Sequence, residues 1–185
     1  MRLFRTLLFL LFLGSASIAA SAQVGIYGSF GYTRYTDHSY NATSSFYGGG
    51  VGAYDDFLHL GPIRAGLDFR GDFLAGNNYR YRDVLGGIRV AVKVPVLPIK
   101  PYGQFSVGVG GPAYTGPFAA GISGVQYSTK FTYEVLGGID ITILPHVDLR
   151  AVEVGYGRMT GVSGGAASNP ASTLFSVRSG IVFRL

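Results

Sequence analysis

Apolar and charged residues alternate along segment 63–73, and this alternation limits the folds that the chain can adopt. The odd-numbered positions carry the apolar residues Ile63, Ala65, Leu67, Phe69 and Phe73. The even-numbered positions carry the charged residues Arg64, Asp68, Arg70 and Asp72. Because successive side chains of a β-strand point to opposite faces, the segment predicts a strand with one apolar and one ionic face. Two surroundings suit such a strand: a β-barrel in lipid with its charges inside, or a soluble barrel or sandwich with the faces reversed.

The first 22 residues have the three parts of a secretory signal peptide. A basic start with Arg2 and Arg5 is followed by the apolar run 6–13 and by small residues that end in Ala-Ser-Ala at 20–22. The alternative, an uncleaved membrane anchor, is weaker because this apolar run is short for a helix that spans a bilayer. We expect cleavage after Ala22 and a single domain over residues 23–185.

The composition of the chain favours the barrel in lipid. Hydrophobic residues make up 48% and charged residues only 14%, whereas charged residues form about 25% of an ordinary soluble domain. Lysine occurs only at 93, 100 and 130, and there is no cysteine to form a disulfide. No window after residue 23 has the ~20 apolar residues of a helical span. The formal net charge of +5 comes with no RNA-binding motif or basic patch, so we expect no nucleic-acid partner.

Eight segments show strand-like alternation or β-rich composition: 24–35, 46–54, 63–73, 79–92, 99–110, 126–142, 147–157 and 173–185. The second, fourth and sixth connections are shortish and each contains proline. The first, fifth and seventh are longer and polar or rich in glycine, and the third is short. Outer-membrane barrels have short periplasmic turns and longer outer loops. The pattern therefore predicts an all-β fold, an eight-stranded antiparallel up-and-down transmembrane β-barrel with both termini on the periplasmic side.

Two details refine the strand assignment. Glu153 falls on the apolar parity of its segment, which predicts a β-bulge near Ala151 and Val152 that turns Glu153 inward. In addition, the sequence Val-Leu-Gly-Gly-Ile at 84–88 recurs at 135–139. This echo is either a repeated hairpin unit or a coincidence between two glycine-rich strands, and in both cases the flanking charged positions share the polar parity.

In a membrane barrel the charged parity must face the interior. An arginine at the lipid face costs about 2–4 kcal/mol at the bilayer midplane, and the interior of an eight-stranded barrel is just wide enough to be filled by side chains. Buried charges must also be paired. We therefore expect one ionic network inside the barrel, formed by Arg64, Asp68, Arg70, Asp72, Asp83, Arg89, Glu134, Asp140, Arg150, Glu153 and Arg178.

The C-terminal segment carries a resemblance to a known family. Its apolar parity consists of Val177, Ile181, Phe183 and Leu185. This segment resembles the closing strand of Gram-negative outer-membrane proteins, although the family's usual final phenylalanine is a leucine here. Segment 100–110 also resembles the fifth strand of small OmpA/OmpX-type barrels. The resemblance implies a standalone outer-membrane barrel, surrounded by outer-membrane lipid, whose C-terminal signal is read by the barrel-assembly machinery. We expect a monomer.

The sequence shows no catalytic constellation. Its histidines are His38, His59 and His146. His59 and His146 fall at expected turns, and His38 lies between Asp37 and Ser39, whose side chains diverge from it and cannot form a relay. No histidine or cysteine spacing fits a metal site. We therefore predict no catalytic residues, no cofactor and no metal.

Three functions remain open at this point. The first is a structural or surface-interaction barrel in the cell outer membrane, with an ion-paired and largely plugged interior. The second is a narrow porin-like channel for small solutes, in which Arg64, Arg70 and Arg150 would favour anions. The third is a soluble periplasmic ligand-binding barrel, which the scarcity of lysine argues against.

Overall fold

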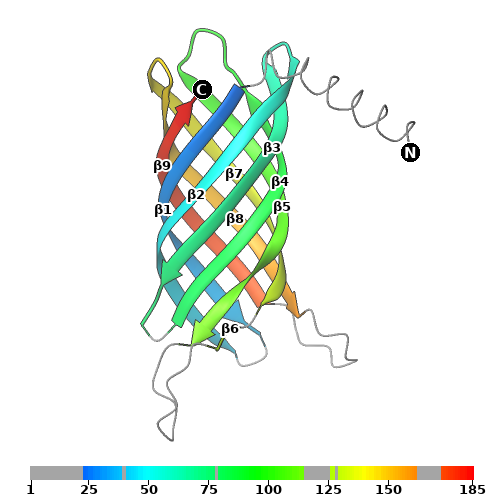
Figure 1. The fold of residues 1–185 in the computed structure, drawn as a ribbon, viewed down its shortest axis with the longest axis vertical. Coiled ribbons are helices and arrows are strands. Elements are labelled where there is room, and N and C mark those ends of the chain that lie inside the picture. The colour runs from blue at the N-terminus through cyan, green and yellow to red at the C-terminus, as the bar shows by residue number, and fades with distance from the viewer. Residues whose placement is uncertain (1–22, 39–40, 78, 115–125, 128, 162–171) are drawn as a thin grey trace, which may run out of the picture.

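A computed structural model shows a closed antiparallel β-barrel with strongly tilted strands (Figure 1). It describes residues 23–38, 41–77, 79–114, 126–127, 129–161 and 172–185. The expected signal peptide therefore lies outside the described residues. Within these ranges there is no helix long and apolar enough to cross a membrane.

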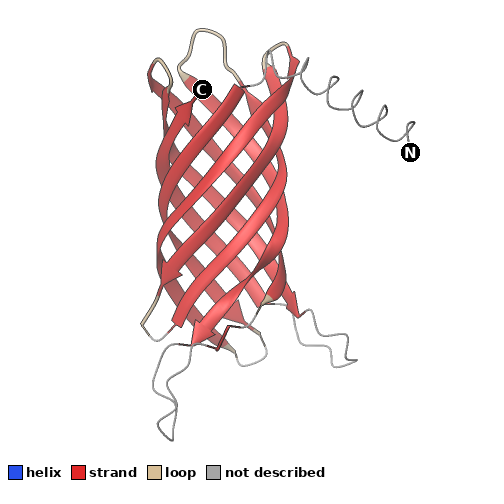
Figure 2. Ribbon diagram, viewed as in Figure 1, coloured by secondary structure: helices blue, strands red, loops and turns tan. Residues whose placement is uncertain are grey.

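Eight long strands form the barrel wall, and one two-residue strand extends it (Figure 2). In chain order they are β1 (Gln23–Asp37), β2 (Ala42–Leu60), β3 (Ile63–Ala75), β4 (Tyr79–Val92), β5 (Ile99–Tyr114), β6 (Gln126–Tyr127), β7 (Lys130–Leu144), β8 (Val147–Gly161) and β9 (Ser172–Arg184). β6 pairs only with the last two residues of β5. The predicted eight-stranded fold is confirmed, and the predicted sixth strand corresponds to β7, with its first two residues in β6.

Each long strand pairs with its neighbours in sequence, in an up-and-down order. The barrel closes where β1 pairs with β9, from Gly25 opposite Arg184 to Thr36 opposite Thr173. The start of β1, the end of β9 and the three short turns between β2 and β3, β4 and β5, and β7 and β8 lie at one end (Figure 1). We call this end the turn end, and we call the opposite end, where β1 ends and β2 begins, the loop end.

Two β-bulges set which residues of β2 and β8 face inward. In β8, Asp140 pairs with Arg150 and Ile139 with Val152, so Ala151 is the extra residue. The predicted bulge is therefore confirmed. The second bulge was not predicted: residues 55–62 were expected to be a turn, but β2 continues to Leu60 with a register shift after Asp55.

The two faces of the wall have opposite chemistry. Apolar side chains cover the outside, and Phe30, Phe69 and Phe73 are each more than 60% exposed there. Inside, most of the buried side chains are charged, polar or tyrosine. This is the arrangement that a barrel in lipid requires, because the sheet closes on itself without a free edge between the long strands and its outer face is apolar.

The interior has layers along the barrel. Near the loop end, six side chains form an apolar and aromatic cluster, Tyr35, Phe46, Leu74, Tyr81, Met159 and Leu174. A second cluster, Tyr27, Tyr54 and Val182, lies toward the turn end. The ionic network described next occupies the space between and beside them.

Candidate functional site: the barrel interior

Ten of the eleven charged residues expected inside the barrel are buried in the structure: Asp68, Arg70, Asp72, Asp83, Arg89, Glu134, Asp140, Arg150, Glu153 and Arg178. The eleventh, Arg64, is half-buried and donates a hydrogen bond to the side-chain oxygen of Gln23 near the turn end. Arg64 thus sits at the edge of the interior, apart from the ion pairs described next.

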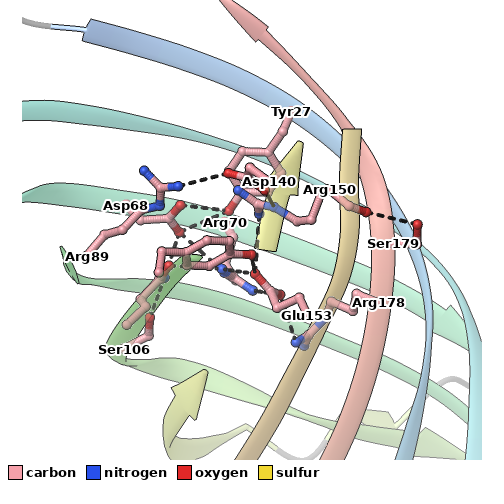
Figure 3. A network of polar contacts seen from close by, with 12 residues as sticks. Tyr27, Asp68, Arg70, Arg89, Ser106, Asp140, Arg150, Glu153, Arg178 and Ser179 are labelled. Carbon is pink, nitrogen blue, oxygen red and sulfur yellow. Dashed lines mark hydrogen bonds and ion pairs between the residues drawn. The ribbon is translucent and has the colours of Figure 1, made fainter. Parts of the chain in front are cut away.

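A continuous series of ion pairs crosses the interior (Figure 3). Arg89 contacts Asp56 at 3.0 Å and Asp140 at 2.9 Å. Asp140 in turn contacts Arg150 at 3.1 Å. Arg150 also forms an ion pair with Glu153. Residues of β2, β4, β7 and β8 therefore belong to one network. Arg89 and Asp140 are also equivalent positions, because each directly follows one copy of the repeated sequence Val-Leu-Gly-Gly-Ile. The ion pair between them therefore joins the two copies.

Glu153 is the junction of this network. Its carboxylate lies 2.6 Å from Arg70, 3.3 Å from Arg150 and 3.5 Å from Arg178. The Tyr102 hydroxyl donates a further hydrogen bond to it at 2.6 Å. Three guanidiniums around one carboxylate can satisfy its lone pairs without water, which is what a buried charge needs. The β8 bulge makes this possible, because it turns Glu153 from the lipid face to the interior.

Arg178 on β9 extends the network toward the loop end. It contacts Asp72 at 2.8 Å and Glu134 at 3.3 Å. Ser176 donates a hydrogen bond to Glu134 at 2.5 Å, and Asp83 accepts one from Tyr81 at 2.7 Å. The acidic side chains are thus held by hydroxyl groups as well as by arginines.

Tyrosine rings enclose two of the arginines. The guanidinium of Arg89 lies 4.0 Å from the ring centre of Tyr54 and 4.5 Å from that of Tyr102. That of Arg150 lies 4.1 Å from Tyr27 and 4.9 Å from Tyr102. A cation over an aromatic face is attracted to it, and the attraction strengthens away from water. The rings therefore fix the arginines in place and fill the space between them.

The tyrosines in turn lie over glycines of the neighbouring strand. Tyr102 pairs with Gly138, and a Cβ on this glycine would lie 2.6 Å from the ring. Tyr27 has the same relation to Gly52. Only glycine leaves room for a ring to fold across the strand at these positions.

Several members of the interior were not predicted from the sequence. Asp56 was assigned to a turn, and the interior tyrosines Tyr27, Tyr54 and Tyr102 were not singled out. A second ionic group near the turn end was also missed, in which Asp148 contacts Lys100 at 2.7 Å and Arg184 at 3.0 Å. Parity gave a signal for the last group, because Lys100 shares the polar parity of its strand with Tyr102 and Gln104.

The C-terminal residues behave differently from the interior ones. Ile181, Phe183 and Leu185 are exposed on the outer face, and Val177 is half-buried. β9 therefore has an apolar outer face, while Arg178 on the same strand faces inward. His38 contacts Thr173 across 3.4 Å on the exposed surface. Within the described ranges, no group of three or more potential ligands could hold a metal ion.

The structure of this chain resembles known proteins, although its sequence does not. No family model and no curated protein matches the sequence. Solved structures do match: Neisserial surface protein A has a TM-score of 0.61 at 12% identity, over 88% of this chain and 97% of that one. The chain has the fold of the small outer-membrane β-barrels of OmpA/OmpX-like type.

Two further neighbours have the same fold. Ail, the attachment invasion locus protein of Yersinia pestis, has a TM-score of 0.55 at 11% identity, over 89% of this chain and 99% of Ail. The outer membrane enzyme PagL has a TM-score of 0.55 at 10% identity, over 82% of this chain and 97% of PagL. Because the fold carries both an enzyme and other surface proteins, it does not by itself decide for or against catalysis.

Proposed function

We propose that this protein is an integral, monomeric outer-membrane barrel with a structural or surface-interaction role and an interior closed to solutes. The observation that carries the proposal is the continuous ion-paired network around Glu153, which fills the middle of the barrel with buried side chains. The apolar cluster at the loop end supports it, because Phe46, Met159 and Leu174 are at most 3% exposed.

The outer face supports the membrane location. Exposed aromatic and branched side chains cover strands around the whole wall, including Phe30 on β1, Ile88 on β4, Val135 on β7 and Phe183 on β9. A soluble protein rarely exposes apolar patches this large. The C-terminal residues Val177, Ile181, Phe183 and Leu185 would serve as the signal for the barrel-assembly machinery.

Conductance in planar bilayers tests the closed interior. We expect the refolded protein to give no steady ion current, whereas a water-filled porin in the same bilayer gives discrete channels. A steady current would support the narrow channel instead, and anion selectivity would assign it to the interior arginines.

Cell fractionation with gel electrophoresis tests the location. We expect the protein in outer membranes, with an unheated sample that runs faster than a boiled one because the closed barrel resists detergent. Recovery in the soluble periplasm without a heat-dependent shift would contradict the proposal and indicate a soluble ligand-binding barrel.

A further inference from the structure

The exposed charged side chains in the described part of this barrel all have the same sign. All ten acidic residues of the chain lie in the described ranges, and each of their side chains is buried or half-buried. The charged side chains that are exposed in those ranges are all basic: Arg34, Arg80, Arg82, Lys93 and Arg158. Among the described residues, the exposed charged side chains are therefore all cationic.

The exposed cations are also concentrated at one end. Lys93 follows β4 at the turn end, but the four arginines lie within three positions of the loop end of their strands. Arg80 and Arg82 are the two that share a strand face, next to each other on the outer side of β4. They share the parity of the exposed residues Val84 and Ile88, which face lipid.

The surface around Arg82 is hollowed on both sides. Phe73 is its cross-strand partner on β3, and the two side chains line two cavities. One cavity, of about 420 Å³, extends over Tyr47 and Ala75 and reaches Arg80. The other, of about 250 Å³, extends over Val84, Val109 and the glycines of β5. Both thus combine an apolar floor with a guanidinium at the loop end.

We propose that Arg80 and Arg82 bind the phosphate of a phosphorylated glycolipid, the lipid A of the outer leaflet, whose acyl chains lie in the two hollows beside Phe73. Arginine suits a phosphate because its planar group donates two parallel hydrogen bonds. Cations at the headgroup level with apolar surface below match a lipid that has phosphate above and acyl chains beneath. The inference takes the loop end to be the external one, as the proposed function does.

Retention of lipid A by the refolded barrel in detergent micelles tests this site, with native mass spectrometry as the readout. The double variant R80Q/R82Q should bind bisphosphorylated lipid A about tenfold more weakly, since each cation near such a surface contributes of the order of a threefold to fivefold change. The matched control is R34Q/R158Q, which removes two exposed arginines from the same end of other strands. We expect it to retain lipid A within about twofold of the parent chain.

Three further comparisons sharpen the result. The variant R80K/R82K keeps both charges and should recover most of the binding, although it lacks the paired donors of arginine. Dephosphorylated lipid A should bind the parent chain as weakly as bisphosphorylated lipid A binds R80Q/R82Q. Phosphatidylglycerol, an anionic lipid with a single phosphate and two chains, should compete poorly.

Several outcomes would overturn the site. Equal losses in R80Q/R82Q and R34Q/R158Q would mean diffuse attraction to the whole loop end. Undiminished binding of dephosphorylated lipid A would leave only contacts with acyl chains, and equal competition by phosphatidylglycerol would remove the preference for lipid A. Because this assay uses purified protein and lipid, it can fail while the conductance and fractionation results stand.

Discussion

Glu153 is the residue on which the interior depends most. Its carboxylate is 1% exposed and contacts Arg70, Arg150 and Arg178. The substitution Glu153→Gln keeps the shape but removes the charge, so that three buried guanidiniums lose their shared partner. Breaking a buried pair in this way costs about 3–5 kcal/mol. We expect a loss of this size in the free energy of unfolding of the barrel in lipid vesicles.

Urea titration can measure this loss through the fraction of protein that keeps the fast-running gel band, since the chain has no tryptophan for fluorescence. Arg34→Gln is the control, because Arg34 is exposed and most surface substitutions change stability by less than about 0.5 kcal/mol. If Glu153→Gln unfolds at the same urea concentration as the parent chain, the junction does not stabilise the barrel.

A second prediction at this scale concerns the glycines beneath the tyrosines. A Cβ on Gly52 would overlap the Tyr27 ring and lie 2.7 Å from the carbonyl oxygen of Phe69. We expect Gly52→Ala to lower the free energy of unfolding by about 1–3 kcal/mol through overpacking. Gly28→Ala is the control, because a Cβ there meets nothing within 4 Å. Equal urea midpoints for the two variants would contradict the close packing.

Among the strands, β8 contains the bulge that determines whether the Glu153 side chain faces the interior or the outside of the barrel. Deleting Ala151 removes the extra residue, so either Glu153 or the residues before the bulge must change faces. A charge in the lipid face costs up to about 2–4 kcal/mol, beyond the loss of its partners. We expect the deletion variant to lack the heat-modifiable band. As a control, one glycine inserted after Pro95 lengthens a turn without changing strand register and should keep the band.

The bulges also show what could be predicted from the sequence. Glu153 was assigned correctly because one acidic residue stood out on an otherwise apolar parity. Asp56 was missed because Asp55 precedes it, and two adjacent acids before Gly61 and Pro62 look like a turn. In the structure, the register shift after Asp55 lets Asp56 reach Arg89 at 3.0 Å.

The alternation of residues along each strand predicted which side chains face the interior, but it did not predict their ion-pair partners. Alternation shows which side chains share a face, and it placed nine of the eleven predicted residues correctly on the buried side, while the predicted bulge placed Glu153 there. The choice of partner depends on strand tilt and register around the barrel, which a single strand does not contain. The tyrosines were missed for a related reason, because tyrosine suits both a membrane interface and a polar interior.

For the whole molecule, the structure predicts which connections face the outside of the cell. Both ends of the described barrel chain and the three short turns lie together at the turn end (Figure 1). A protease site inserted after Asn77, at the loop end, should be cut in intact cells. The same site inserted after Val96, at the turn end, should be cut only after the outer membrane is opened. The reverse pattern would invert the barrel and would place Arg80 and Arg82 at the inner leaflet.

The junction at Glu153 also bears on how such a chain can be assembled. Its partner Arg70 is 83 residues earlier in the chain, and Arg178 lies on the last strand. No single hairpin contains a complete set of partners, so a partly inserted hairpin would bring unpaired charges into contact with lipid. Each partly inserted intermediate therefore has a free-energy cost from its unpaired charges. This cost is removed only when β9 pairs with β1. The interior charges therefore favour the complete barrel, because a barrel that lacks its last strand would leave buried charges unpaired in the bilayer.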